Sequence, residues 1–483
     1  MKKVLTKIVA ATLLLATGSL MNRASANNLT ITGTSVAGSN ITFNISWDNS
    51  WNTNIAPANW DAAWIFVKYQ DCSTRLWNHA TLSTVGTDHT AGSPLQVDVV
   101  TDGMGVFLRR SANGGGSTGT VSVTLKMTIP AGTYNYKVFG VEMVNIPQGN
   151  FEVGDGSSTS SFTNYTVIAA SQSGGLNSAT LGNGQNIPAA FPMGYNSMYC
   201  MKYEITQEQY MEFLNTLTYD QQKTRTVNDP ISAAGTYAMN GSYQNRQGLV
   251  IATPGNNNVL PAVYACDATA GTYNSANDGQ NLAMNFLSWG DLTAYLDWSA
   301  LRPMTEMEFE KICRGPMAHV AGEYPWGSTN LTQCYSTMVS NPLQTNESYG
   351  TISNGLCNYG VGSGNATYGP LRAGIFATNS SGRESSGATY YGVMEMGGNC
   401  YERAVNTGTT AGVAFTGVLG DGTLTTQGDP NVTNWPSPTT ATGSGQRGGQ
   451  WVSAATYVRT SDRVQATTTD ATRLYLNGGR GVR

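Results

Sequence analysis

The chain has 483 residues, with 26 Lys and Arg against 30 Asp and Glu, a formal net charge of −4 and 56 glycines. Charged residues make up 12% of the chain, about half the usual share, and this balance excludes the basic surface by which proteins bind nucleic acid. The 40% apolar content excludes a disordered chain, and the glycines lack the three-residue period of collagen. A chain of this length is expected to form two or three domains.

The first 26 residues have the pattern of a secretory signal peptide. Lysines near the start precede a short apolar run over 8–16, and Ala24-Ser25-Ala26 fits a small-x-small cleavage site. The run is too short to span a bilayer, and no later segment reaches about 18 continuous apolar residues. Because no Cys follows the cleavage site, we expect no lipid anchor. The sequence therefore predicts an exported protein, periplasmic, cell-surface or extracellular, that does not span a membrane.

Residues 27–140 have the alternating pattern of half-buried β-strands. Apolar residues occupy every second position over 41–47 and 121–129, and the apolar run 64–67 suits the core of a sandwich. We therefore predict a β-sandwich domain of immunoglobulin-like size. One continuous strand is expected from Tyr136 to Val144, so this domain should pack closely against the second one, which we place at 141–483.

Beyond residue 141 the sequence predicts few helices and long loops. Capping-box patterns place helix starts after Thr206, Ser288 and Thr305, each followed by a stripe of apolar residues. Glu306, Glu308 and Glu310 are expected to act as capping acids of the third helix. Stretches rich in Gly, Ser, Asn and Thr separate the helices, which indicates a loop-rich α+β fold built mainly of ordered loops.

Seven short motifs occur in a fixed order over this second region. They lie at 143–151, 203–207, 288–289 with 302–310, 324–327 (YPWG), 391–399, 447–451 (RGGQW) and 479–483. Together they resemble the formylglycine-generating enzyme, or sulfatase-modifying factor, family. The resemblance implies a loop-rich fold related to C-type lectins, and it does not extend to residues 28–140.

The chemistry of that family depends on two cysteines. Its enzymes use oxygen and a copper(I) ion held by two thiolates to oxidise a sulfatase cysteine to formylglycine, and soft thiolates suit copper(I). The resemblance places these cysteines six and eleven residues after Arg447, where this chain has Ser453 and Val458. No Cys follows Cys400. We therefore expect no copper and no formylglycine generation, and the three histidines do not support the iron-dependent oxidation of other family members.

The resemblance also implies structural calcium. One site would use two carboxylates and two backbone carbonyls, namely Glu395, Gly398, Cys400 and Glu402. A second would begin at the side chain of Asn358 and the carbonyl of Tyr359, although its acidic partner is not evident. The alternative is that the acids bond to their own loop or pair with Arg403 or Arg447.

The remaining charged and sulfur-bearing residues favour structural roles. Arg447, Arg459 and Arg463 near the C-terminus are expected to bond loop carbonyls or acids, with anion or peptide recognition as the alternative. The chain has seven cysteines but no C-x-x-C motif, which argues against a zinc site. Buried thiols or one to three disulfides are both open.

Two functions from different classes remain at this stage. The first is an exported, non-catalytic member of the family that serves as a secreted or surface module for binding or display, with a protein, a glycan or a second copy as its partner. The sandwich opening at 45–68 looks like domains attached to such modules in exported Bacteroidetes proteins. The alternative is a formylglycine-generating oxidase, which the missing cysteine pair disfavours.

Overall fold

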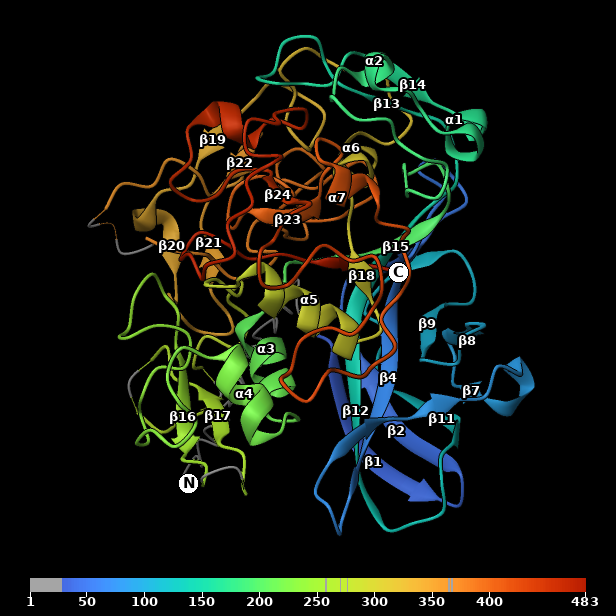
Figure 1. The fold of residues 1–483 in the computed structure, drawn as a ribbon, viewed down its shortest axis with the longest axis vertical. Helices are drawn as coiled ribbons and strands as arrows, with labels where there is room; N and C mark the ends of the chain where they lie inside the picture. The colour runs from blue at the N-terminus through green and yellow to red at the C-terminus, as the bar shows by residue number, and fades with distance from the viewer. Residues whose placement is uncertain (1–27, 257–258, 270, 276, 364, 366–367) are drawn as a thin grey trace, which may run out of the picture.

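The computed structural model describes residues 28–256, 259–269, 271–275, 277–363, 365 and 368–483. The predicted signal peptide at 1–26 lies outside these residues. The chain forms a β-sandwich at one end and a loop-rich body at the other, and the long strands β4 and β12 run between them (Figure 1).

One sheet of the sandwich is formed by β1 (Thr30–Ala37), β2 (Asn40–Ser46) and β11 (Val121–Thr128), all antiparallel. Two short strands, β6 (Thr81–Leu82) and β7 (Thr90–Ala91), pair with β11. The predicted alternation is confirmed, because Phe43 and Val123 are buried whereas their neighbours Thr42 and Thr124 are partly exposed. The hydroxyls of the two threonines are hydrogen-bonded at 2.9 Å.

The second sheet belongs to both halves of the molecule. Its centre is the antiparallel pair β4 (Asp61–Asp71) and β12 (Tyr134–Ile146). On the sandwich side β4 pairs with β9 (Val106–Arg110) and, farther along, with β5 (Trp77–His79), and β8 (Leu95–Val99) follows β9. Beyond β12 follow β15 (Met198–Met201), β25 (Gly481–Val482) and β18 (Arg302–Pro303). The predicted continuous strand is thus β12, and the expected domain boundary at 140/141 falls inside it.

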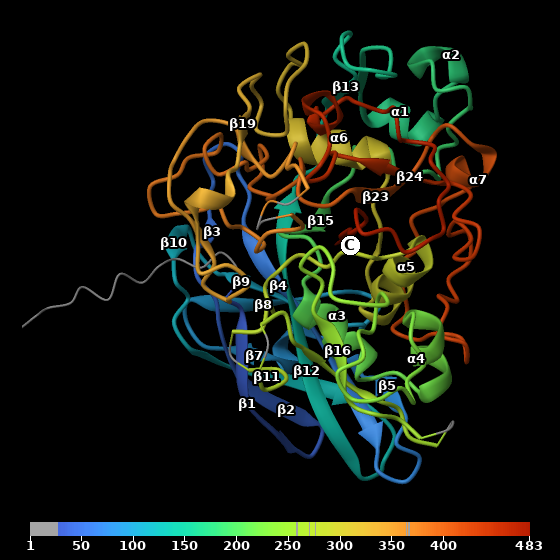
Figure 2. The same cartoon turned by 90° about the vertical axis from the view of Figure 1, so that its left-hand side faces the viewer.

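Both faces of β4 and β12 are buried, which explains the apolar run at 64–67. Ile65 and Val67 face the sandwich core with β2 and β11. Trp64 and Phe66 face the loop-rich body, where Phe66 contacts Trp298 of a helix with ring centroids 5.1 Å apart. Figure 2 shows the helices of the loop-rich body on one side of this pair of strands and the sheet of β1, β2 and β11 on the other.

The three predicted helices are present, with capping boxes at the predicted residues. They are α3 (Gln207–Leu214) capped by Thr206, α5 (Trp289–Trp298) capped by Ser288, and α6 (Glu306–Arg314) capped by Thr305. The other helices are short: α1 (Ala169–Gly174), α2 (Ser178–Leu181), α4 (Tyr219–Arg225) and α7 (Thr410–Val413). Single-turn 3-10 helices occupy Gly86–Asp88, Ser336–Met338 and Ala455–Val458.

Small two-stranded ladders hold the remaining loops. They are β3 (Ser50–Asn52) with β10 (Gly114–Gly116), β13 (Phe151–Val153) with β14 (Tyr165–Val167), β16 (Leu249–Thr253) with β17 (Val263–Cys266), β19 (Thr332–Gln333) with β22 (Leu356–Cys357), β20 (Val339–Ser340) with β21 (Ser348–Tyr349), and β23 (Glu402–Val405) with β24 (Ser444–Arg447). All seven cysteines are free thiols, of which Cys72 is exposed and the other six are buried. Of the two options that the sequence left open, the structure therefore has thiols rather than disulfides.

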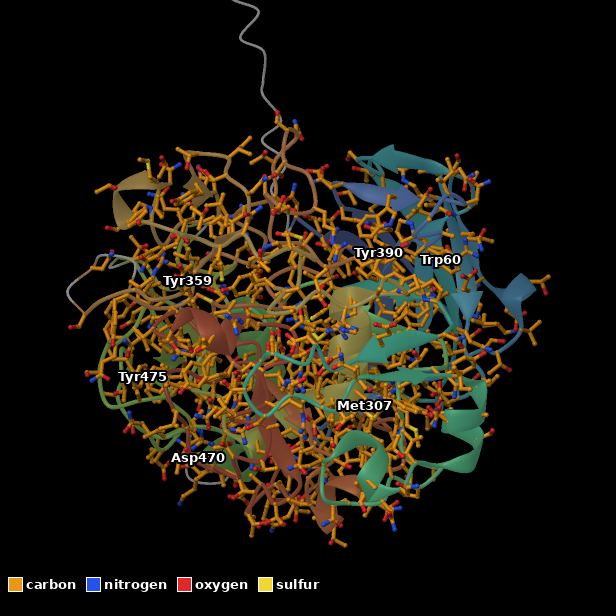
Figure 3. All side chains as sticks on the ribbon, turned by 90° about the horizontal axis from the view of Figure 1, so that it is seen from above. Trp60, Met307, Tyr359, Tyr390, Asp470 and Tyr475 are labelled. Carbon is orange, nitrogen blue, oxygen red and sulfur yellow. The ribbon has the colours of Figure 1, made fainter. Side chains whose placement is uncertain are left out.

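The two halves meet along one side of the loop-rich body. Seen from above, Tyr390 lies beside the sandwich near Trp60, whereas Tyr359 and Tyr475 lie on the opposite side (Figure 3). Within the described part of the chain, no helix has the length and apolarity needed to cross a membrane.

Candidate functional site

The first position at which the resemblance expects a thiolate, Ser453, lies in a turn after β24. Its Oγ accepts a hydrogen bond from the backbone N–H of Gln450 at 3.0 Å, and its own N–H donates to the Gln450 carbonyl at 2.8 Å. The side chain is buried. The hydroxyl is thus held by its own turn, and a hydroxyl is not a ligand that copper(I) prefers.

The second position, Val458, ends the 3-10 helix Ala455–Val458 and is fully buried. It belongs to an apolar cluster with Tyr324, Trp326 and Cys357. Gly397 packs so closely that a Cβ there would lie 2.9 Å from Cγ1 of Val458. Hydrocarbon therefore fills the position at which the resemblance expects the second thiolate, and the two residues together do not fit a copper(I) site.

A sulfur atom does lie in this cluster, on Cys357 of β22. Its Sγ donates to the carbonyl of Gly397 at 3.2 Å, and burial together with the nearby Cys334 thiol raises the pKa of Cys357 well above its usual range. Burial also raises the pKa of Cys334 to about 12. Both sulfurs are held as neutral thiols, whereas metals bind the thiolate. The sequence did not indicate this neighbour of Val458, because the two residues lie on separate loops.

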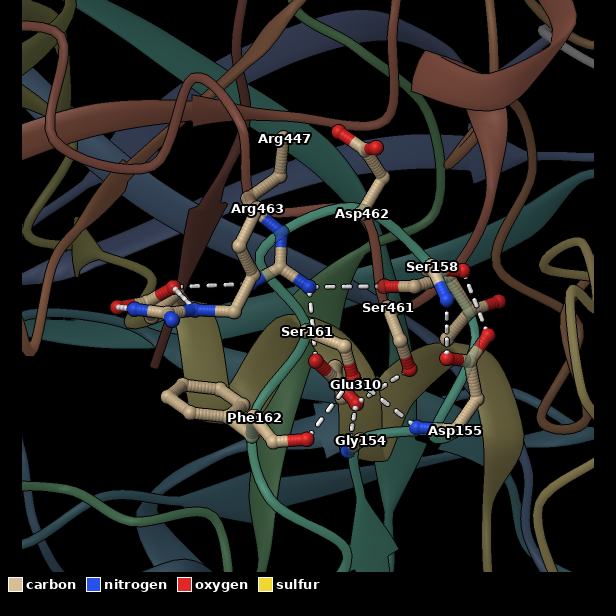
Figure 4. Close-up of polar contacts among 12 residues, drawn as sticks. Gly154, Asp155, Ser158, Ser161, Phe162, Glu310, Arg447, Ser461, Asp462 and Arg463 are labelled. Atoms are coloured by element: carbon tan, nitrogen blue, oxygen red, sulfur yellow. Dashed lines mark hydrogen bonds and ion pairs between the residues drawn. The ribbon is translucent and has the colours of Figure 1, made fainter. Parts of the chain in front are cut away.

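A buried ion-pair network lies beneath the same segment (Figure 4). Arg447 at the end of β24 binds Oε2 of Glu306 and Oε1 of Glu310, each at 2.9 Å. Arg463 binds Glu306 through Nε at 2.7 Å, and Arg314 binds Glu310 at 3.1 Å. Helix α6 thereby anchors the C-terminal segment to the core through two carboxylates.

The network lowers the pKa of Glu306. Burial alone would raise the pKa of Glu306, but Arg463 and Arg447 lower it to about 2. Glu308 is the acid that caps α6, since its Oε2 accepts from the N–H of Thr305 at 2.9 Å. The capping role is thus confirmed for Glu308, whereas Glu306 and Glu310 form ion pairs with arginines. The expected structural role of Arg447 and Arg463 is confirmed, and Arg459 hydrogen-bonds to Tyr324.

Two of the four predicted ligands of the first calcium site, Glu395 and Glu402, meet at Arg480. Nε of Arg480 binds Oε1 of Glu402, and its Nη2 donates to the carbonyl of Glu395 at 3.3 Å. Oε1 of Glu395 accepts from the N–H of Gly374 at 2.8 Å. The alternative prediction paired these acids with Arg403 or Arg447. It named the wrong arginine, because Glu402 forms its ion pair with Arg480.

A third carboxylate, Glu204, completes this cluster. It accepts hydrogen bonds from Nδ2 of Asn399 and from the N–H of Cys400, the latter at 2.8 Å. Burial, reinforced by Glu402, raises the pKa of Glu204 well above its usual range, and burial raises the pKa of Glu395 to about 7. The sequence analysis missed Glu204 as a site residue, although it lies inside the recognised motif at 203–207.

A comparison with protein families identifies the loop-rich half of the chain. The model of the sulfatase-modifying factor enzyme 1-like domain matches residues 135–475. The chain belongs to this family. The match begins within β12, where the sheet passes from the sandwich to the loop-rich body. No curated protein matches the chain significantly.

In this sulfatase-modifying factor domain the guanidinium of Arg480 already binds one oxygen of Glu402. Oε2 of Glu395 and Oε2 of Glu402 are buried and have no hydrogen-bond partner among the described residues. Carboxylate and carbonyl oxygens are the ligands that calcium prefers, and a buried oxygen without a partner is costly. In the described residues no three His, Cys, Asp or Glu side chains are grouped to hold a metal. The ion would therefore depend on two carboxylates with the carbonyls of Gly398 and Cys400.

The residues of the second predicted calcium site already have protein partners. Nδ2 of Asn358 donates to the carbonyl of Gly369 and to Oδ1 of Asn399, both at 3.1 Å, and the Asn358 carbonyl accepts from the N–H of Asn399 at 2.9 Å. A small cavity separates Asn358 from Glu395, and Arg372 lines it. The two predicted sites are thus neighbours across this cavity. Tyr359 is partly buried at the edge of the Val458 cluster.

Proposed function

We propose that this chain is an exported, non-catalytic sulfatase-modifying factor protein that acts as a secreted or surface module for binding or assembly. The observation that carries the proposal is the pair Ser453 and Val458. The serine hydroxyl is used by its own turn, and the valine is sealed in an apolar cluster with Trp326. Neither side chain can supply the thiolate that copper(I) chemistry requires.

The scaffold function fits the way the loops are held. Buried arginines, including Arg447 and Arg480, tie loops to carboxylates in the core, and a structural calcium ion at Glu395 and Glu402 would add to this support. In this proposal the fold is related to C-type lectins, and the ordered loops display a surface to a protein, a glycan or a second copy of the chain.

The alternative function is a formylglycine-generating oxidase. It would need a copper site from other sulfurs, and the thiol nearest to the expected position, Cys357, is kept protonated by burial. The structure therefore gives no support for this alternative through the residues that the resemblance assigns.

The experiment uses the full-length protein with copper(I), oxygen and a sulfatase peptide that contains C-x-P-x-R. We expect no aldehyde in the peptide by mass spectrometry, whereas a family enzyme with both cysteines converts it under the same conditions. Copper(I) titration should show no high-affinity site in the wild type, and the variant Ser453→Cys/Val458→Cys should gain one. Conversion of the peptide by the wild type would overturn the proposal, and the variant Cys357→Ser would then test the source of the sulfur.

A further inference from the structure

A pocket of about 390 Å³ lies where the sandwich meets the sulfatase-modifying factor domain. The sandwich contributes the loop around Trp51, and the other half contributes the segment around Arg383 and Tyr390. Tyr390 borders the sandwich in Figure 3. The volume falls in the range of small-molecule sites, which are concave and lined by aromatic side chains with a few placed polar groups. Ser453, Val458 and the predicted calcium ligands do not line it.

The sandwich wall of this pocket is held rigidly by Asp61 of β4. The Asp61 carboxylate accepts hydrogen bonds from the backbone N–H of Trp51 at 2.8 Å, from Oγ of Ser50 at 2.9 Å and from Nε1 of Trp47 at 3.0 Å. Nε1 of Trp51 donates to Oδ1 of Asn59 at 3.2 Å. The polar edge of Trp51 is thus already bonded to protein, and its partly exposed ring is presented to the pocket.

The part of the lining that comes from the other half of the molecule combines an aromatic ring with a cation. Tyr390 is partly exposed, and the guanidinium of Arg383 lies 5.4 Å from the centre of its ring. Nη2 of Arg383 donates to the carbonyls of Cys313 at 3.3 Å and Pro325 at 3.2 Å. Its Nε is buried and has no hydrogen-bond partner among the described residues, and the carboxylates of Glu323 and Glu384 lie near enough to stabilise its charge. The guanidinium of Arg383 is therefore held in place by two carbonyls, with no direct ion pair in the described part of the chain.

The pocket as a whole is positive, although the chain is negative. Its described lining contains Lys202 and Arg383 but no Asp or Glu. Lys202 has its own partners, Glu142 at 3.1 Å and Asp61 at 3.4 Å, so Arg383 is the cation of the described lining without a direct ion pair. Amide and hydroxyl groups complete the rim, at Asn49, Thr53, Thr378 and Ser381.

We propose that this junction pocket binds a sugar residue that carries an anionic group. The C–H face of a pyranose packs on the electron-rich face of an aromatic ring such as Trp51 or Tyr390. The rim amides and hydroxyls match sugar hydroxyls in donor and acceptor capacity. A carboxylate or sulfate on the sugar supplies the direct ion pair that the partly exposed Arg383 lacks, and a planar guanidinium binds such oxyanions well. This inference rests on the proposed binding role and names the class of its ligand.

The test is isothermal titration of the full-length chain with trigalacturonate, its methyl-esterified form and galactose 6-sulfate. We expect an anionic sugar to bind and the neutral ester to bind about tenfold more weakly, the size of one charge-assisted hydrogen bond. Binding of the uronate alone identifies a carboxylate ligand, and binding of the sulfate ester alone identifies a sulfate ligand; either supports the proposal. Equal binding of the ester, or no binding of any of these sugars, overturns it.

Variants locate the site. Arg383→Gln and Asn49→Asp should each weaken anionic sugar binding about tenfold, since one removes the cation and the other adds a negative charge at the rim. Asn49 is exposed, so its variant should fold normally, and Asn113→Asp makes the same charge change on an exposed loop outside the lining. Unchanged affinity in both pocket variants, or binding only of a peptide with a free carboxylate, overturns the proposal. Failure here leaves the non-catalytic function standing, because that function fails only if aldehyde forms.

Discussion

Arg447 and Glu306 lie 141 positions apart in the chain, yet Nη1 of the arginine is 2.9 Å from Oε2 of the glutamate, and both side chains are fully buried. Arg463 binds the same carboxylate. The start of α6 therefore holds two points of the C-terminal segment, the one in which the resemblance expects the catalytic thiolates. The position of that segment therefore depends on a buried carboxylate at the start of α6.

We predict that Glu306→Gln destabilises the protein by about 3–5 kcal/mol. The substitution removes the negative charge but leaves the guanidinium groups of Arg447 and Arg463 buried, and breaking one side of a buried pair has a cost of this size. Urea unfolding followed by tryptophan fluorescence measures the loss. The matched control is Glu212→Gln, whose ion pair with Lys137 is partly exposed and should contribute less than about 1 kcal/mol.

The same pair predicts a pH dependence. The folded-state pKa of Glu306 is lowered to about 2 from an ordinary value of 4.5, so the unfolded chain binds this proton more readily. The stability from Glu306 is complete above pH 4.5 and is lost as the pH falls toward 2. The gap in unfolding free energy between wild type and Glu306→Gln should therefore shrink between pH 5 and pH 3. A constant gap over that interval would show that the pair does not control the titration.

The sequence was sufficient to predict those helix starts and strands that are determined by residues close together in the chain. The helix starts at Thr206, Ser288 and Thr305 were predictable because a capping box is complete within four residues. The sandwich strands were predictable because period-two alternation records which face is buried, as at Phe43.

Pairings between distant segments could not be predicted in this way. For example, β12 pairs with β15 through residues such as Val144 and Cys200, and no local pattern in the sequence indicates this pairing. For the same reason the sequence led us to predict Glu402 as a calcium ligand but did not indicate Arg480 as its partner, and it could not show that Cys357 packs beside Val458.

Calcium should stabilise the folded protein through Glu395 and Glu402. An ion that binds only the folded state adds about 2.7 kcal/mol when its free concentration is a hundred times its Kd. We therefore expect the Tm to rise with calcium and to fall on addition of EDTA, as measured by calorimetry. Glu395→Gln should abolish the calcium-dependent part, although its Oε1 can still accept from the N–H of Gly374.

Two comparisons make the calcium prediction specific. Magnesium should have a smaller effect, because it demands a tighter octahedral site and gives up its waters reluctantly. Glu212→Gln, which changes an acid outside the cluster, should keep the full response to calcium. A Tm that EDTA and added calcium both leave unchanged would exclude a structural ion at this cluster.

Gly398 is the point at which the two loops of the predicted calcium region touch. A Cβ at this position would lie 2.5 Å from the carbonyl oxygen of Asn358 and 2.5 Å from Sγ of Cys357, and its φ is +75°. We predict that Gly398→Ala costs about 3 kcal/mol or more, because backbone strain adds to a clash with a main chain that cannot move aside. Urea unfolding measures the cost.

Gly184→Ala separates these two causes. Gly184 has a similar φ of +83°, but a Cβ there would meet nothing within 4 Å. Its substitution should therefore cost only the backbone strain, about 1 kcal/mol. Equal losses in the two variants would mean that the contact with Asn358 and Cys357 is unimportant. A much larger loss at Gly398, with a weakened response to calcium, would show that the close approach of the two loops builds the cation site.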